Sequence, residues 1–471
     1  MHLDQPTPEG AVNNGQPWWR LLSRYHWFVL VVAALGWLFD TMDQQLFILA
    51  RNPAMRELLE EMPGETPEAF RKRADILGTW ATSIFLIGWG TGGIIFGILG
   101  DRIGRARTML LTILVYSLFT GLSAVSVGFL DFALYRFLTG LGVGGEFAVG
   151  VALVAEVMPD RARPFALGLL QALSAVGNVT AALINMALGQ LESEGVFQNF
   201  YVFGYGPVSA WRTMFVIGAL PALLAILIRR RLKEPERWTV IAQMSAARQL
   251  GSVRELLGDS RWRRNALLGL CLAISGQVGL WGIGFYFPEL TRSVFRRTFE
   301  GQGLSPDEVE GQLKIWAGIT SLLLNAGAFF GISAFSRVTY YLGRKPTFAI
   351  AFIAALLSTA LVFGTLDQFG EIFWMIPLMG FCQLSLFGGY AIYFPELFPT
   401  RLRSTGTSFC YNVGRFAAAA GPPMFGLLLN LFDYPPPMPH RYAGLVMCSV
   451  FLVGLLALPF APETKGKPLP E

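Results

Sequence analysis

The stretch AEVMPDRAR, Ala155 to Arg163, returns later in the chain as PELFPTRLR, Pro395 to Arg403. Within it Glu, Pro and two Arg recur in register, at an offset of 240 positions. A Gly-Arg pair also recurs, at Gly104-Arg105 and at Gly343-Arg344, with an offset of 239. Two separate motifs that share almost one offset indicate that the chain consists of two related halves.

The composition points to a membrane protein. Of 471 residues, 53% are hydrophobic and 15% are charged. Soluble proteins carry about 25% charged residues, so this chain lacks the charge to cover soluble domains, and its hydrophobicity excludes disorder. The 52 glycines suit closely packed membrane helices. The four cysteines and three histidines have no metal-ligand spacing, so we expect neither a metal nor a cofactor.

Apolar runs of about 20 residues, the length that crosses a bilayer as a helix, recur along the whole chain. They predict an all-α membrane protein with twelve transmembrane helices. The predicted spans are 26–50, 78–100, 108–128, 132–157, 165–190, 211–231, 265–287, 315–336, 347–366, 371–395, 404–432 and 442–461.

The basic residues are divided unevenly between the two sets of loops. With a cytoplasmic N-terminus, 24 Lys and Arg fall on the cytoplasmic side and 10 on the outer side. The positive-inside rule therefore places both termini in the cytoplasm, and we expect a multi-pass protein of the cell inner membrane. This topology accounts for the net charge of +5, so the expected partner is the lipid bilayer and not nucleic acid.

The repeat and the spans divide the chain into five parts. We predict a cytoplasmic tail (1–25), an N-terminal six-helix bundle (26–231), a cytoplasmic linker (232–264), a C-terminal six-helix bundle (265–461) and a second tail (462–471). The linker contains a possible amphipathic surface helix around 238–257; the alternative is a solvated connection.

Several motifs resemble those of the major facilitator superfamily, and together they extend over the whole chain. Gly97–Arg105 resembles its loop 2–3 motif, and Arg136–Glu146 resembles the fourth span of its sugar-porter-like branch. The stretch 395–403 and the tail Pro462–Gly466 resemble the same branch. The resemblance implies twelve helices in two pseudo-symmetric six-helix bundles, with the substrate bound between them near the midplane.

Other positions depart from the sugar-porter pattern. The seventh span lacks the Gln-Gln…Asn run, and Ala391 replaces a Trp of the tenth span. The stretches 144–146 and 409–415 are more similar to branches that carry organic acids with protons. We therefore expect a non-enzymatic, proton-coupled symporter of a small organic solute, an organic acid above all, acting as a monomer. The alternatives are a sugar or polyol porter, a uniporter, a drug-efflux antiporter and a membrane sensor that does not transport.

Charges inside a bilayer are expensive, so those at mid-span depth are candidates for function. Asp40, Asp43 and Gln44 share one face of the first span. By the resemblance, Asp40 is the proton carrier and Arg136 its switchable partner; the alternative is a static ion pair. Glu146 is a second candidate for proton coupling, or a carboxylate bonded to a neighbouring helix.

Arg415 is a candidate for binding the carboxylate of the substrate, because the planar guanidinium matches a carboxylate bidentately. The alternative is that it balances the charge of Glu146. We expect further pocket residues with polar or aromatic side chains, although each could instead be a packing residue. They are Asp43, Gln44, Gln171, Asn178, Gln277, Trp281, Tyr286, Tyr390 and Asn412.

The charged residues of the repeated motifs are predicted to form a cytoplasmic gate. They are Asp101, Arg102, Arg105, Glu156, Arg163, Arg344, Glu396 and Arg403. The resemblance implies ion pairs that hold the cytoplasmic side closed. We expect exposed pairs, worth about 0–1 kcal/mol each. Tyr340 stands where the second copy of the motif would have Asp, which predicts a weaker gate in that half.

Overall fold

The computed structural model describes residues 17–196, 201–202, 205–207, 209–223, 228, 231–243, 250–283, 287–420, 424, 427–429, 431–432 and 438–470. The described chain is predominantly helical. A single short antiparallel pair, β1 (Tyr201–Val202) and β2 (Tyr205–Pro207), is the only sheet in these residues.

The described part of the first half contains six longer helices, which pack against one another. They are α1 (Arg24–Leu58), α2 (Pro67–Arg102), α3 (Arg105–Ser123), α4 (Phe129–Val157), α5 (Arg163–Ser193) and α6 (Ala210–Gly218). We call them the N-terminal group. Two short helices follow, α8 (Glu236–Gln243) and α9 (Val253–Gly258), in the predicted linker. The predicted surface helix around 238–257 is thus divided, and residues 244–249 lie outside the described chain.

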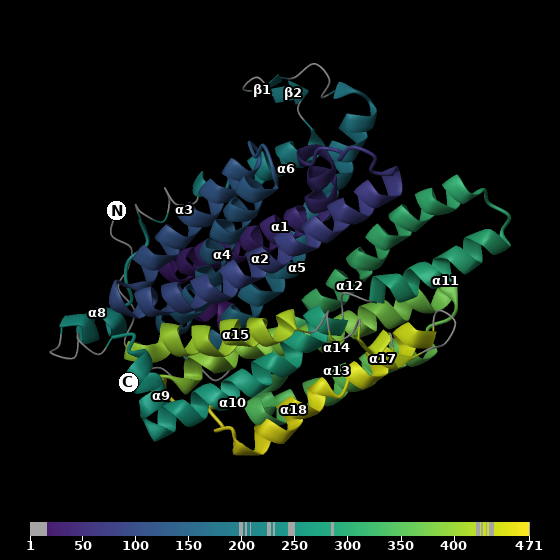
Figure 1. The fold of residues 1–471 in the computed structure, drawn as a ribbon. Helices are drawn as coiled ribbons and strands as arrows, with labels where there is room; N and C mark the ends of the chain where they lie inside the picture. The colour runs from purple at the N-terminus through teal and green to yellow at the C-terminus, as the bar shows by residue number, and fades with distance from the viewer. Residues whose placement is uncertain are drawn as a thin grey trace.

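The second half forms a C-terminal group. Its longer members are α10 (Ser260–Gln277), which continues as a π-helix (Val278–Ile283), α11 (Phe287–Gly301), α12 (Pro306–Leu342), α13 (Arg344–Thr365), α14 (Ile372–Tyr393), α15 (Arg403–Ala419), α17 (Met438–Met447) and α18 (Val450–Ala457). Figure 1 shows the two groups side by side, with α8, α9 and the C-terminal tail at one end of the molecule. We call this end the linker side.

Within the described ranges, nine helices are long and apolar enough to cross a membrane. They coincide with the predicted spans one to five, eight to ten and twelve. The sixth, seventh and eleventh predicted spans each include residues outside the described chain, so they are not compared over their full length. The count of twelve and the division into five parts stay predictions.

Two predicted loops are largely helical in the structure. The predicted loop 51–77 shortens to 59–66, because α1 continues to Leu58 and α2 begins at Pro67. The Thr66 side chain caps α2, and Ser305 and Glu308 form a capping box that starts α12 within the predicted loop 288–314. Apolar runs end where the membrane ends, whereas helices end at caps.

The repeat in the sequence reappears in the packing. A Cβ at Gly88 or Gly92 of α2 would overlap the backbone carbonyls of Phe137 and Leu141 on α4. A Cβ at Gly327 or Gly331 of α12 would overlap the carbonyls of Pro377 and Phe381 on α14. These contacts correspond at offsets of 239 and 240 positions, as the sequence motifs do. The two halves therefore use small residues in the same way to bring two helix backbones together.

The groups meet mainly through α2 with α15 and α5 with α12. On the linker side, the backbone N–H and the hydroxyl of Thr405 on α15 both donate to Asp101 on α2. Near mid-helix, Asn178 donates to Asn325 across the same interface at 3.0 Å. Further hydrogen bonds between the groups, from Arg105 to Thr400, from Arg403 to Glu156 and from Arg161 to Tyr340, also lie on the linker side. The contacts thus belong to a state that is closed on the linker side.

Candidate transport site and gate

Two carboxyl groups face each other between α1 and α4. Asp40 and Glu146 are each 1% exposed, and their side chains interact with one another. A Cβ at Gly36 would overlap the Glu146 carboxyl, so the glycine makes the space that brings Glu146 against α1. None of the four carboxyl oxygens has a hydrogen-bond donor among the described residues.

This geometry has a consequence for protonation. Two adjacent buried carboxylates repel each other, and burial penalises each charge further. A proton shared between them removes the repulsion and supplies the missing donor. The Asp40–Glu146 pair can therefore hold a proton inside the molecule.

The predicted pairing of Asp40 with Arg136 is wrong. Arg136 instead lies against Asp43, with 3.9 Å between Nη1 and Oδ2. It also donates to Ser123 Oγ at 2.7 Å and to Thr139 Oγ1 at 3.0 Å. Its guanidinium lies 4.5 Å from the ring centroid of Phe215.

The reason for this pairing is the antiparallel course of α1 and α4. Arg136 precedes Glu146 by ten residues, about 15 Å along a helix, so it lies farther from the linker side. Asp43 lies one turn farther from the linker side than Asp40, because α1 begins at that side. The two acids of α1 therefore meet different partners on α4: Asp43 meets the arginine, and Asp40 meets the glutamate.

Arg415 of α15 lies beside this acid pair. It is 4% exposed, and its Cζ is 3.4 Å from the centroid of the Trp89 ring on α2, a cation–π contact. It interacts with the Tyr411 hydroxyl and electrostatically with Asp40. Its Nε and Nη1 have no hydrogen-bond partner among the described residues. A buried cation with unused donors is the kind of group that receives an anion.

The other predicted pocket residues divide into two sets. Asn412 is a packing residue between the groups, since it donates to Gly144 O at 3.3 Å and to Ser408 Oγ at 2.9 Å. Tyr390 donates to Leu272 O at 2.6 Å inside the C-terminal group. The Asn412 amide is held through its Nδ2, while its Oδ1 has no hydrogen-bond partner among the described residues.

Of the remaining predicted residues, Gln277 and Gln171 keep a polar atom without a partner among the described residues. Gln277 donates to Tyr411 O at 2.6 Å, and its Oε1 has no partner in the described chain. Gln171 is buried, and its Oε1 likewise has no described partner. Trp281 meets Trp89 edge-to-face at 6.4 Å. Gln44 is buried, and Asn178 bonds Asn325. Tyr286 lies outside the described residues.

Two residues of this region were missed in the sequence, Trp89 and Tyr411. The Arg415 guanidinium lies over the rings of both residues, and the Tyr411 ring also stacks on that of Phe147, with 4.0 Å between the ring centroids. An aromatic residue in an apolar run gives no signal that separates it from a lipid-facing one.

The predicted gate contains a network that joins the two groups on the linker side. Arg105 meets Asp101 at 3.0 Å and Glu156 at 2.9 Å, and it donates to Thr400 O at 2.6 Å. Arg403 meets the same Glu156 at 2.7 Å across the interface. The expectation of exposed pairs is wrong, because the side chains of these four charged residues are fully buried. They are buried because α15 and its preceding turn pack over the ends of α2 and α4.

The other gate candidates act within one group or on the linker. Arg344 and Glu396 pair inside the C-terminal group at 2.7 Å. Arg163 contacts Asp160 and donates to Ala155 O. Arg102 donates to Leu250 O at 3.3 Å, which ties α2 to the linker.

Tyr340 makes a contact of its own in place of the missing acid. Its hydroxyl accepts from Arg161 Nε at 3.2 Å, and its ring lies 5.2 Å from that of Phe165. This contact crosses from the C-terminal to the N-terminal group, so the second copy of the motif also has a link between the groups.

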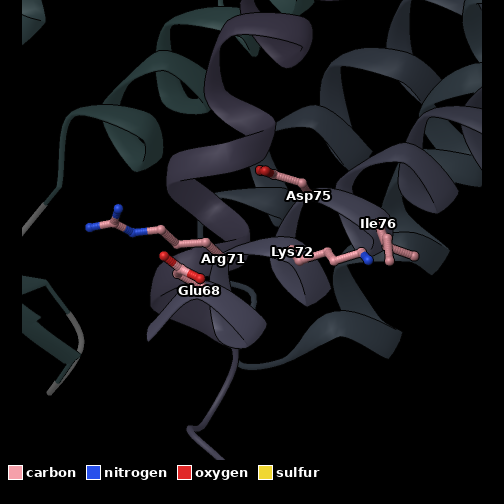
Figure 2. Close-up of a pocket in the computed structure, with 5 residues that line it drawn as sticks. All are labelled: Glu68, Arg71, Lys72, Asp75 and Ile76. Atoms are coloured by element: carbon pink, nitrogen blue, oxygen red, sulfur yellow. The ribbon is translucent and has the colours of Figure 1, made fainter. Parts of the chain in front are cut away.

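A depression at the start of α2 lies away from these residues. It is lined by Glu68, Arg71, Lys72, Asp75 and Ile76, and Figure 2 shows these side chains pointing in different directions. The mixture of both charge signs within two helical turns does not favour one class of ligand. The described residues also contain no group of three His, Cys, Asp or Glu that could hold a metal.

Comparisons with known proteins cover both halves of the chain. The profile of the Major Facilitator Superfamily matches residues 74–305, and that of the Sugar (and other) transporter family matches residues 243–471. A Haemophilus influenzae protein named for metabolite transport is 28% identical, over 95% of this chain and 99% of its own. The cis,cis-muconate transport protein of Acinetobacter baylyi is 28% identical, over 74% of this chain and 77% of its own.

The fold is similar to that of a solved transporter. The structure of the proton:xylose symporter XylE of E. coli, bound to 6-bromo-6-deoxy-D-glucose, aligns with a TM-score of 0.71. The alignment covers 94% of this chain and 98% of that chain at 18% identity. The two profiles, the matched relatives, the helical membrane architecture and the internal repeat agree. The chain therefore belongs to the major facilitator superfamily and is a multi-pass membrane transporter, not an enzyme.

Proposed function

We propose that this transporter carries a small carboxylate together with a proton by alternating access. The observation that carries the proposal is the position of Arg415, a buried guanidinium with unpartnered Nε and Nη1 beside the Asp40–Glu146 pair. An anion site next to a proton site provides a means of coupling the two.

The coupling follows from charge balance. When the acid pair carries a negative charge near Arg415, part of the attraction of the guanidinium is already used. When the pair takes up a proton, Arg415 is free to bind a substrate carboxylate. Binding of either partner thus favours binding of the other, by the same factor in both directions. The matched relative named for muconate transport supports a carboxylate as the substrate class.

Sidedness and direction belong to the same proposal. In the predicted topology the side that carries the linker holds 24 basic residues against 10 on the other, which supports a cytoplasmic linker side with both termini inside. The closed state would then face outward, and the inward proton gradient of a cell inner membrane would drive uptake. Asp43 and Arg136 would form a fixed support for α1 and α4.

A sugar or polyol is the second candidate substrate. Gln171 is buried with a free Oε1 and suits a hydroxyl group, and the sugar-transporter profile matches the C-terminal half. Uptake by the purified protein in liposomes, with and without an inward proton gradient, separates the candidates. We expect gradient-driven uptake of carboxylates such as muconate. Equal uptake of neutral sugars, or uptake that ignores the gradient, contradicts the proposal.

A further inference from the structure

A cleft of about 980 Å³ opens on the linker side, far from the acid pair. It lies between the start of α10, the end of α18 and the C-terminal tail, which Figure 1 shows as a yellow trace beside α10. Three basic residues line it, Arg261, Arg264 and Lys467.

The negative charges of the cleft are already bound. Glu396 accepts from Arg344 and from Thr464, at 2.7 and 2.6 Å. Glu463 accepts the backbone N–H groups of Arg344 and Lys345 at the start of α13, at 2.9 and 3.0 Å. These hydrogen bonds, together with two from its own turn, lower the pKa of the Glu463 carboxyl and outweigh the effect of its burial, which raises the pKa.

The three cations, in contrast, have no carboxylate within 4.0 Å among the described residues. Arg261 lies 4.6 Å from the centroid of the Trp262 ring, and Arg264 donates to Phe460 O at 3.0 Å. The Arg264 bond uses one of its five N–H donors, and the Arg261 contact uses the flat face of the guanidinium and no N–H donor. Most of the donors of both arginines can therefore bind a ligand. The cleft therefore presents unpaired positive charge.

The cleft is continuous with a membrane-facing apolar surface. Phe460 lines it and is 62% exposed, and Leu456, one turn earlier on α18, is 72% exposed. Leu267 of α10, which packs against α18, is 49% exposed. A ligand with a negative head and apolar chains satisfies both surfaces, whereas a free phosphate satisfies only the first. Basic pockets beside membrane helices hold anionic headgroups for this reason.

We propose that this cleft binds the phosphate headgroup of an anionic phospholipid, with the acyl chains along α10 and α18. The headgroup would touch a tail that is itself part of the gate, because Pro470 O accepts from Arg403 at 2.9 Å and Leu469 is buried. A bound lipid would therefore support the state that is closed on the linker side.

The test measures lipid retention by the purified full-length protein, with native mass spectrometry and phosphatidylglycerol as the probe. Arg261→Gln, Arg264→Gln and Lys467→Gln together should weaken retention more than about tenfold, since each cation contributes to the attraction. Arg107→Gln, Arg254→Gln and Arg263→Gln together are the control, since they remove the same charge from exposed positions that do not line the cleft. Arg261→Lys with Arg264→Lys keeps the charge and should keep retention, which separates lost binding from misfolding.

Equal retention by the two triple variants overturns the proposal. Retention of phosphatidylcholine as strong as that of phosphatidylglycerol overturns it as well. Binding of glycerol phosphate or inorganic phosphate as tight as that of the lipid would keep the anion site but refute the lipid as its ligand.

Discussion

Arg415 is the residue whose surroundings bear most directly on the cargo. Its guanidinium is fixed over Trp89 and beside Tyr411, so its free donors already point in a set direction. A lysine at this position would keep the charge but lose the planar fork that binds a carboxylate through two parallel hydrogen bonds.

We therefore expect Arg415→Lys to raise the KM for a carboxylate substrate about tenfold or more, with less effect on kcat. Initial uptake rates in proteoliposomes measure both. Arg441→Lys is a matched control, since Arg441 donates to backbone carbonyls at the far end of the C-terminal group. An unchanged KM for every carboxylate tested would remove Arg415 from the binding site.

For single residues, the sequence identifies the buried charged side chains of the site better than it identifies the partner of each. Asp40, Glu146 and Arg415 stand out because charges are rare inside spans. Their pairing depends on how far two helices slide along each other, which no local pattern records, so the predicted Asp40–Arg136 pair was wrong. Tryptophans give no signal at all: Trp89 is buried against Arg415, whereas Trp80, nine residues earlier on the same helix, is 59% exposed.

Among the helices, the contact between α2 and α4 depends on glycine. Gly92→Ala places a methyl group against the Leu141 carbonyl, a backbone group that cannot turn away. We expect lower thermal stability in detergent and reduced transport, because the two helices must separate. Gly150→Ala in α4 is the control, since a Cβ there meets nothing within 4 Å and alanine favours a helix. Equal melting temperatures of the two variants would contradict this account of the packing.

The start of α13 is capped from a distance by Glu463, and this cap should depend on pH. The pKa of Glu463 lies below its ordinary value of 4.5, so the carboxylate stabilises the fold fully above that value. The stabilisation is lost as the pH falls through the lowered pKa. Glu463→Gln should therefore cost about 1 kcal/mol at pH 7, the usual scale of a helix cap, and less at pH 3. Thermal unfolding at both pH values measures the difference, and an equal loss at the two would contradict it.

Element ends were predicted less well than element existence. Nine predicted spans coincide with apolar helices of the structure, because long apolar runs are unambiguous. The helical extensions beyond α1 and before α12 were not predicted, because charged residues end an apolar run without ending a helix. The caps at Thr66 and Ser305 are the signal that would have marked those ends.

For the whole molecule, Glu156 is the point at which the closed state is held. It alone accepts from Arg105 on its own side and from Arg403 across the interface. Glu156→Gln would leave the buried guanidinium of Arg403 without a carboxylate and that of Arg105 with Asp101 alone, and breaking a buried pair typically costs about 3–5 kcal/mol. The closed state would bear this cost and an open state would not, so the population should shift towards opening on the linker side.

Spin labels at Arg107 and Tyr341, exposed positions on the linker side of the two groups, can follow this opening by pulsed EPR. We expect Glu156→Gln to increase the population with a longer distance. Glu255→Gln, which removes a partly exposed pair with Arg401, should change it little. Identical distance distributions for Glu156→Gln and the unmodified protein would show that this network does not hold the gate.

The architecture followed from the sequence because the repeat, the apolar runs and the motifs gave the same answer. The strength of the gate ion pairs could not be predicted, because the sequence does not show whether a pair is exposed or buried. Because the pairs are buried, breaking them costs more free energy when the linker side opens. Substrate binding or proton transfer elsewhere must offset this cost during the transport cycle.

The most direct test of proton coupling compares two kinds of transport by Asp40→Asn. Without a titratable Asp40, the pair with Glu146 cannot exchange a proton as before, but the Arg415 site stays intact. We predict that proton-driven accumulation of a carboxylate in proteoliposomes is lost while exchange of labelled for unlabelled substrate continues. Full accumulation by Asp40→Asn under the same proton gradient would contradict the central claim that this acid pair couples the proton to the substrate.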